Sequence, residues 1–330
     1  MAERMRAMEF RAVGEPLSCV ERPLPEPGAN ELLIEVSACA VCRTDLHIVD
    51  GDIVGRRPVV PGHEVVGRVI ALGAGVTGFA LGNRVGVPWL GGTCGTCGYC
   101  MKGAENLCDA PAFTGFTRDG GFATHMVADA RYCFAIPDIY DDAEAAPLLC
   151  AGLIGFRSYR MAGDAHRLGL YGFGAAAHLL AQVAVGDGRR VFAFTKPGDI
   201  AGQDFALRLG CIWAGGSDEA PPEELDAAII FAPVGALVPE ALKRVRKGGR
   251  VVCGGIHMSA IPSFPYEDLW GERQVVSVAN LTREDGIAFM DRIGRDHVKV
   301  VTTTFPLAKA NEAIAAVRAG SVEGAAVLLP

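Results

Sequence analysis

The stretch Leu168-Gly169-Leu170-Tyr171-Gly172-Phe173-Gly174-Ala175-Ala176-Ala177 decides the fold class of this 330-residue chain. Its first four residues form an apolar run, which predicts a short buried strand. The alanines after the second glycine predict the start of a helix over roughly residues 175–185. Gly172 and Gly174 therefore lie in a tight turn between a strand and a helix, a unit typical of α/β proteins.

Similar patterns alternate along the chain after this stretch. Strands separated by helices form βαβ units, in which the strands are parallel. The alternation predicts a doubly wound parallel sheet of the Rossmann type over residues 147–281. The predicted strands are Arg190–Phe194, Ala227–Phe231, Arg250–Cys253 and Val275–Val278, and a second helix contains Asp204–Leu209.

Residues 1–146 have a different texture, in which short β-like runs are separated by Gly and Pro. Examples of these runs are Leu32–Val36, Gly67–Leu72 and Asn83–Val87. Short strands at this spacing predict a mostly-β domain.

The last stretch, residues 282–330, is mixed. Apolar residues at helical spacing between Pro306 and Arg318 predict a helix, and Ala325–Leu329 is a further apolar run. We expect this run to form a final strand that rejoins the mostly-β domain.

Composition and charge exclude several classes of protein. Hydrophobic residues make up 50% of the chain, enough for a large core, and 38 acidic residues against 31 basic ones give a net charge of −7. A protein that binds phosphate backbones needs the opposite sign, so no nucleic-acid partner is expected. The N-terminus lacks the apolar segment of a signal peptide, and no apolar run approaches the ~20 residues that span a bilayer. We expect a soluble, cytoplasmic protein without a membrane partner.

Eleven cysteines in a chain without export signals favour metal binding or catalysis over a disulfide framework. Cys94, Cys97, Cys100 and Cys108 have the spacing C-x2-C-x2-C-x7-C on one Gly-rich loop. Four thiolates suit a closed tetrahedral Zn²⁺ site, which is structural because no position stays open. An iron–sulfur cluster is the alternative, but the bacterial ferredoxin run has a last gap of three residues followed by Pro, whereas Asp109 follows here.

A second group of candidate metal ligands is spread along the chain. Cys42 and His63-Glu64 lie 21 residues apart within the mostly-β stretch, and Cys150 lies at the junction with the next stretch. Catalytic zinc takes three protein ligands and keeps one exchangeable position, so two cysteines and one histidine could hold it. Taken singly, each residue also suits a structural role: His63 follows a glycine, and Cys150 lies in an apolar run.

The turn quoted first is also the candidate cofactor site. Gly172, Phe173, Gly174 and Ala177 form the pattern G-x-G-x-x-A between a strand and a helix, which is the context of the dinucleotide-binding fingerprint. Gly172 permits the tight turn, Gly174 lets a pyrophosphate approach the backbone, and the helix N-terminus supplies N–H donors.

The second strand of the sheet indicates which dinucleotide is bound. NAD sites usually place Asp or Glu about 20 residues after the fingerprint to bind the ribose 2′-hydroxyl. Here the strand ends in Thr195-Lys196, with no carboxylate before Asp199. A hydroxyl and a cation suit a 2′-phosphate, so NADP(H) is favoured over NAD(H); alternatively, Lys196 is only a solvated turn residue.

With these motifs assembled, the chain resembles the zinc-containing alcohol dehydrogenases of the medium-chain dehydrogenase/reductase superfamily, for which two cysteines and one histidine are a known catalytic zinc set. The resemblance covers nearly the full length and rests on Cys42–His47, Pro61–Gly67, the cysteine loop and Ala146–Gly152. It implies a GroES-like mostly-β catalytic domain (1–146), a Rossmann cofactor domain (147–281) and a C-terminal segment (282–330) that returns to the catalytic domain.

The resemblance also implies roles for individual residues. The implied roles are: catalytic zinc ligands, Cys42, His63 and Cys150; an acidic neighbour of the metal, Glu64; the hydroxyl that hydrogen-bonds the alcohol oxygen, Thr44; the outer end of a proton relay, His47; the carboxylate that orients the ligand histidine, Asp45; a pyrophosphate contact, Arg43; and pocket positions, Trp89 and Ile53. Ile53 stands where yeast-type relatives have a second tryptophan.

The sequence thus predicts an NADP-preferring oxidoreductase with two zinc ions per chain, acting on a primary alcohol or aldehyde. One alternative is another zinc oxidoreductase of the same superfamily, acting on polyols, ketones or enones. The other is a non-catalytic regulatory protein that binds nicotinamide or zinc. We expect the chain to form a homo-oligomer, either a dimer or a tetramer.

Overall fold

The structure of the chain is a computed structural model that describes residues 3–330. It divides into two compact units, Met1–Ala151 with Leu281–Pro330, and Gly152–Asn280. Each unit contains its own sheet and its own apolar core.

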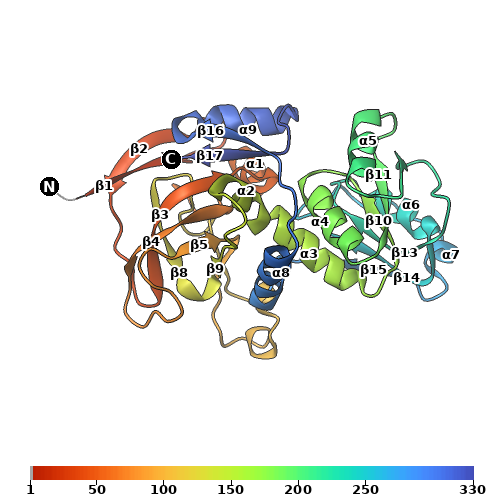
Figure 1. Cartoon of the computed structure of the whole chain (residues 1–330), viewed down its shortest axis with the longest axis horizontal. Coiled ribbons are helices and arrows are strands. Elements are labelled where there is room, and N and C mark those ends of the chain that lie inside the picture. Colours follow the sequence, from red (N-terminus) through yellow and green to blue (C-terminus); the bar gives the residue numbers. More distant parts are fainter. Residues whose placement is uncertain (1–2) are drawn as a thin grey trace. The chain divides into compact units, whose positions relative to one another are not determined.

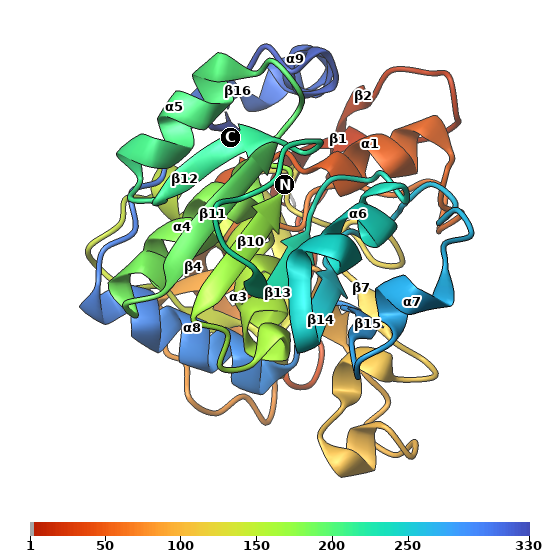
Figure 2. The same cartoon turned by 90° about the vertical axis from the view of Figure 1, so that its right-hand side faces the viewer.

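The second unit is built on a six-stranded parallel sheet (Figure 2). Its order is β12-β11-β10-β13-β14-β15, so the strands, numbered by their appearance in this unit, follow the order 3-2-1-4-5-6 of a Rossmann domain. The quoted fingerprint follows β10, at the point where the strand order reverses. The strands are β10 (Arg167–Tyr171), β11 (Arg190–Thr195), β12 (Trp213–Gly216), β13 (Leu225–Ile230), β14 (Val245–Cys253) and β15 (Gln274–Ser277).

Helices connect most of these strands, as the alternating pattern predicted, whereas a loop without a helix joins β12 to β13. One helix, α3 (Ala151–Ala162), was not predicted, because Gly152 and Gly155 lower helix propensity. Gly155 has a packing role there, since a Cβ atom on it would lie 3.2 Å from the carbonyl oxygen of Ala176 in α4. The remaining helices of this region are α4 (Ala175–Gly186), α5 (Ile200–Arg208), α6 (Leu237–Arg244) and α7 (Tyr266–Leu269).

The first unit is mostly β. Its main sheet has seven strands in the order β16-β17-β3-β4-β5-β9, with β8 paired to β3, and two further pairs are β1-β2 and β6-β7. The strands are β1 (Arg4–Glu9), β2 (Ser18–Pro23), β3 (Glu31–Ala40), β4 (Val65–Leu72), β5 (Arg84–Val87), β6 (Leu90–Gly92), β7 (Ala112–Phe113), β8 (His125–Asp129), β9 (Phe134–Ala135), β16 (Thr302–Pro306) and β17 (Ala325–Leu329).

The C-terminal segment lies in this first unit. β17 pairs antiparallel with β3, with Leu328 opposite Cys39, and α9 lies along β16 and β17 (Figure 1). The α-helices of the unit are α1 (Arg43–Asp50), α2 (Asp142–Ala145), α8 (Arg283–Arg295) and α9 (Ala310–Ala319). Its 3₁₀ turns are η1 (Cys100–Lys102), η2 (Glu105–Leu107), η3 (Ala130–Tyr132), η4 (Ala146–Leu149) and η5 (Leu307–Lys309).

The boundary expected after residue 146 lies after Ala151 instead. The reason is that η4 is fully buried against β3, β4 and β5 of the first unit, so the chain leaves this core only after Cys150. Among residues 3–330, no helix has the length and apolar character that crossing a bilayer requires.

Two buried tyrosines, one in each unit, differ in how their hydroxyls are satisfied. Tyr171 is fully buried and stacks on Phe194 with ring centroids 4.0 Å apart, but its hydroxyl has no hydrogen-bond partner in the described part of the chain. The Tyr140 hydroxyl donates to the Ile293 carbonyl at 3.3 Å and accepts from the Val298 amide at 2.9 Å.

We therefore expect opposite effects from removing the two hydroxyls. Tyr171→Phe removes a buried group without a partner and should raise the free energy of unfolding by about 1 kcal/mol. Tyr140→Phe strands two buried backbone groups and should lower it by about 1–3 kcal/mol. Urea unfolding of both variants and the parent measures the difference. A stability loss in Tyr171→Phe would contradict the absence of a partner for that hydroxyl.

Candidate functional site

The sheet of the first unit brings together four side chains that can bind a metal: Cys42, His63, Glu64 and Cys150. Their ligand atoms all lie within 4.8 Å of one another. The register of β3 and β4 explains two of these positions, since Cys39 pairs with Val65. Cys42 follows the end of β3 and His63 precedes the start of β4, so the antiparallel pairing places both at one edge of the sheet. Cys150 follows the buried turn η4, and its Sγ lies 3.7 Å from Cys42 Sγ.

Asp45 connects the two loops that carry these ligands. Its side chain has no solvent exposure. Oδ2 accepts the backbone N–H of Cys42 at 2.9 Å, and Oδ1 accepts the N–H of Gly62 at 3.2 Å. Oδ1 also lies 3.4 Å from His63 Nδ1. The carboxylate expected to orient the ligand histidine therefore also holds the backbone on both sides of the site.

The His63 imidazole tests whether this cluster suits a metal. Both ring nitrogens are buried, and neither has a hydrogen bond within the described chain. Buried polar atoms are normally satisfied, so such a ring needs a further partner. An imidazole nitrogen, two thiols and a nearby carboxylate are ligands that Zn²⁺ accepts, so the residues present fit the metal.

The ionisation of the cluster is shifted by burial and by mutual contacts. A hydrogen bond from Cys150 and the proximity of His63 hold the pKa of the Cys42 thiol below its usual value. Burial alone would lower the pKa of His63, but Asp45 outweighs it and raises the pKa. Burial, together with the charge of Cys42, raises the pKa of Glu64. Metal binding requires the thiolate, which the lowered pKa of Cys42 favours.

The two residues expected in a proton relay lie on α1. Thr44 is buried, and its Oγ1 lies 3.7 Å from Cys42 Sγ. His47 is partly exposed, and its Nδ1 lies 2.8 Å from Asp52 Oδ2. Asp52 was missed by the sequence analysis; it is reached because the chain turns back after α1, where the Asp52 amide donates to the His47 carbonyl at 3.0 Å. Arg43 lies at the exposed first position of this helix.

An aromatic wall adjoins the ligand histidine. The edge of the His63 ring meets Trp89 with centroids 4.9 Å apart. Trp89 stacks on Phe113 and Phe116, at centroid distances of 5.0 and 5.5 Å. The two phenylalanines were not predicted, because nothing in their local sequence marks them as neighbours of Trp89. Ile53, the other expected pocket position, is partly buried and packs on the core of the same unit.

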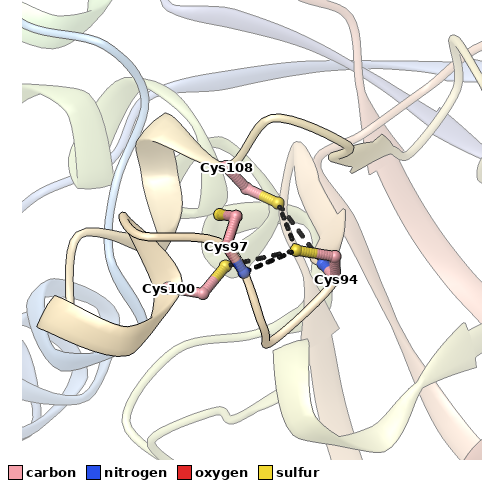
Figure 3. Close-up of side chains that lie close together, drawn as sticks. All are labelled: Cys94, Cys97, Cys100 and Cys108. Atoms are coloured by element: carbon pink, nitrogen blue, oxygen red, sulfur yellow. Dashed lines mark hydrogen bonds between the residues drawn. The ribbon is translucent and has the colours of Figure 1, made fainter.

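The second cluster is the cysteine loop (Figure 3). The side chains of Cys94, Cys97, Cys100 and Cys108 gather around one point, with all four sulfur atoms within 4.8 Å of one another. Cys94 Sγ lies 3.5 Å from Cys108 Sγ and 4.0 Å from Cys100 Sγ. The backbone amides of Thr96 and Cys97 hydrogen-bond to Cys94 Sγ and lower the pKa of this thiol to about 6. This loop is preorganised to present a thiolate.

The Gly-rich turn has the geometry that a bound pyrophosphate needs. Gly172 has a φ of +87°, and a Cβ atom there would lie 2.8 Å from the Ala232 amide nitrogen, so only glycine fits. Gly174 caps α4, and a Cβ atom on it would meet nothing within 4 Å, which leaves the helix N-terminus open. Ala177 is a buried residue of α4, and Phe173 contacts the ring of Phe205 edge-on.

Thr195 and Lys196 at the end of β11 differ from each other. The Thr195 hydroxyl is buried, donates to the carbonyls of Lys196 and Gly215 at 3.1 and 3.4 Å, and accepts from Gln203 Nε2 at 3.2 Å. The Thr195 hydroxyl is therefore engaged with the protein in this structure, and its expected role in cofactor binding stays a prediction. Lys196 is exposed.

Comparisons with known proteins agree with this geometry. Residues 28–138 match the family model described as the alcohol dehydrogenase GroES-like domain. The chain is 45% identical to "Probable alcohol dehydrogenase AdhA" of Mycobacterium tuberculosis, over 98% of this chain and 97% of the relative.

Solved structures agree over the whole chain. A cinnamyl alcohol dehydrogenase from Sorghum bicolor has a TM-score of 0.89 and 27% identity, covering 99% of this chain and 97% of that one. A cobalt- and zinc-bound thermostable alcohol dehydrogenase from Pyrobaculum aerophilum has a TM-score of 0.90 and 25% identity, covering 99% and 100%. Both comparisons extend across the two units described above.

Proposed function

The chain belongs to the zinc-containing alcohol dehydrogenase family of the medium-chain dehydrogenase/reductase superfamily, and from this premise we propose that it is a zinc-dependent enzyme that prefers NADP(H) and acts on primary alcohols or aldehydes. It is an NAD(P)-dependent alcohol dehydrogenase, and its substrates are small-molecule alcohols. The observation that carries the finer proposal is the buried group of Cys42, His63, Glu64 and Cys150, with its unsatisfied imidazole.

In this proposal Cys42, His63 and Cys150 hold the catalytic zinc, and Glu64 lies beside it. When bound, zinc supplies a Lewis acid that makes an alcohol hydroxyl easier to ionise, and NADP⁺ supplies the hydride acceptor. Asp45 keeps the His63 ring and the Cys42 loop in place, which preserves the ligand geometry while substrates exchange. The zinc bound to the Pyrobaculum relative supports this assignment.

Thr44 and His47 move the proton. The buried Thr44 hydroxyl accepts the proton of the substrate hydroxyl and passes its own proton outward. His47, which is partly exposed, exchanges that proton with solvent, and Asp52 fixes the orientation of its ring at Nδ1.

The open helix N-terminus after Gly174 would bind the pyrophosphate through backbone N–H groups. The family resemblance separately implies a pyrophosphate contact for the exposed Arg43. Exposed Lys196 would pair with the 2′-phosphate that distinguishes NADP from NAD. The absence of a carboxylate between Thr195 and Asp199 supports this preference, because a carboxylate would repel that phosphate.

Cys94, Cys97, Cys100 and Cys108 hold the second zinc ion in this proposal. Four sulfur ligands would fill all positions of a tetrahedral ion, so an ion held there would have no exchangeable position and would be structural. The amides that hydrogen-bond to Cys94 Sγ support a stable thiolate there.

We further propose that the enzyme is a homo-oligomer, a dimer or a tetramer. Strand β15 is the edge of the Rossmann sheet, so its outer backbone groups are available to a second chain. Three large apolar side chains that line one open pocket there are exposed: Val275, Ile256 and Ile261. An uncovered apolar patch beside an open strand is typical of an interface.

The metal assignment predicts close to two zinc atoms per chain by elemental analysis. Cys42→Ser should lose one zinc and all turnover while keeping the thermal stability of the parent. Cys97→Ser should lose the other zinc and unfold at a lower temperature, because a structural zinc site contributes directly to folding. Cys19→Ser, an exposed cysteine outside both clusters, is the control and should keep both ions.

Two results would refute the metal assignment. Detection of iron with acid-labile sulfide would show that the cysteine loop binds an iron–sulfur cluster instead of zinc. Full occupancy of both zinc sites without turnover on any alcohol or aldehyde would favour a regulatory protein on the same scaffold.

The cofactor assignment predicts tighter binding of NADPH than of NADH. Lys196→Ala should weaken NADPH binding about tenfold, the value of one charge-assisted contact, and leave NADH nearly unchanged. Fluorescence titration of both nucleotides gives the two dissociation constants. The control is Lys243→Ala, a surface lysine of the same unit that pairs with Glu240. If the ratio of the NADPH and NADH dissociation constants were the same in the parent and in Lys196→Ala, Lys196 would not contribute to the preference for NADPH.

The pocket assignment predicts a preference for alcohols longer than ethanol. Trp89 supplies an apolar wall, and Ile53 leaves more room than an indole would. Each buried methylene contributes about 0.8 kcal/mol, close to fourfold in kcat/KM, so the preference should climb along the straight-chain series and then level off. Ile53→Trp should reduce activity on longer alcohols and spare ethanol. A parent enzyme with its highest kcat/KM on ethanol would refute this pocket.

A further inference from the structure

We propose that Asp119 is a positioning residue which, together with the backbone of Gly120-Gly121, holds the segment Val60-Pro61-Gly62 and thereby fixes the His63 imidazole for metal binding. The proposal rests on the proposed function, in which His63 is a ligand of the catalytic zinc. Asp119 lies far from His63 in sequence, and nothing in its local sequence marks it as part of the site. Its side chain is 37% exposed.

Each residue of Val60–Gly62 is hydrogen-bonded to the segment Asp119–Phe122. Asp119 Oδ1 accepts the Val60 N–H at 3.0 Å. The carbonyls of the segment are then taken in turn by the chain that follows Asp119: Val60 by the Gly120 amide at 2.7 Å, Pro61 by the Phe122 amide at 2.9 Å, and Gly62 by the Gly121 amide at 2.9 Å. We call Asp119–Phe122 the brace, since it contacts every residue of Val60–Gly62.

The amide groups of the segment are held by two carboxylates. Pro61 has no N–H, so Val60 and Gly62 carry the only donors of this segment. The Val60 N–H binds Asp119 in the brace, and the Gly62 N–H binds the buried Asp45 at 3.2 Å. Every backbone N–H and C=O group of Val60–Gly62, the segment that leads into His63, therefore has a hydrogen-bond partner.

Close backbone contact makes the brace stiff. A Cβ atom on Gly120 would lie 2.0 Å from the Gly62 carbonyl oxygen, and one on Gly115 would lie 2.8 Å from the Gly62 nitrogen. Gly62 itself has a φ of +94°, and a Cβ atom on it would lie 2.4 Å from the Phe122 ring. The two segments touch where side chains would separate them, so a shift of one must move the other.

Arginine contacts hold the Asp119 carboxylate in turn. Its Oδ2 accepts from Arg22 Nη1 at 2.9 Å, and Arg56 Nη1 lies 4.0 Å from Oδ1. Arg22 is itself paired with Glu9 on β1. These groups line an open groove, so replacing Asp119 leaves no buried cavity and the variants should fold. What the brace loses in Asp119→Ala is one acceptor, the partner of the Val60 amide.

The first test uses hydrogen exchange of the protein as purified, a measurement that does not depend on activity. Asp119→Ala should increase exchange at Val60 at least tenfold, because its amide loses its acceptor. Asp119→Asn should restore protection, since an amide oxygen can still accept that N–H. The control is Asp129→Ala, which removes a carboxylate paired with Arg131 in the same unit but away from Val60–Gly62. Unchanged exchange at Val60 in Asp119→Ala would overturn the brace.

The second test measures zinc retention by competition with a chelator. Asp119→Ala should release the catalytic zinc at about tenfold lower chelator concentration, the usual effect of losing a group that supports a ligand. The zinc of the cysteine loop, identified in the Cys42→Ser variant, should be released as in the parent. Asp119→Asn and Asp129→Ala should both retain the catalytic zinc as the parent does.

The outcomes separate this proposal from the proposed function. Zinc retention in Asp119→Ala within twofold of the parent would overturn the positioning role, as would an equal loss in Asp129→Ala. A loss in Asp119→Asn as large as in Asp119→Ala would also overturn it, because the hydrogen bond to Val60 would then not be the cause. A parent protein with zinc in the cysteine loop alone would overturn the proposed function, whereas the exchange measurement would still decide whether the brace exists.

Discussion

The buried carboxylate of Asp45 is the contact on which the site depends, because it joins two loops that the chain separates by more than a dozen residues. A carboxylate without solvent exposure is costly unless it is paired and hydrogen-bonded. Asp45 meets this condition with the amides of Cys42 and Gly62 and with the neighbouring His63 ring. The same contacts that make its burial tolerable set the distance between a thiol ligand and an imidazole ligand.

The sheets supply the frame for these contacts. Pairing of Cys39 with Val65 brings the end of β3 beside the start of β4, so the ligands just beyond each strand meet at one edge. In the other unit, the reversal of strand order beside β10 leaves the Gly172–Gly174 turn open at the end of the sheet. In both units regular backbone pairing fixes the position of an irregular loop, and the loop carries the chemistry.

The two candidate metal-binding clusters differ in how far apart their members lie in the sequence. Cys94, Cys97, Cys100 and Cys108 lie on one short loop, where spacing alone limits how far their sulfur atoms can separate. Cys42, His63 and Cys150 come together only through strand pairing and the burial of η4. The second cluster is therefore coupled to the packing of its whole unit. Its candidate ligands lie beside Asp45, Trp89 and the brace, each contributed by a different part of the chain.

The sequence by itself determined the order of strands and helices around Leu168–Ala177, the local thiol cluster and the candidate ligands, because these depend on periodicity, glycine positions and short spacings. It did not reveal α3, whose glycines reduce helix propensity but permit close packing on α4. Nor did it show that the Thr195 hydroxyl faces the protein, that Asp52 meets His47, or that Phe113 and Phe116 stack on Trp89. Only the tertiary structure decided these contacts, because each depends on the register and packing of segments distant in the chain or on the direction of a turn. The pattern of side chains along one segment does not identify the segment against which it packs.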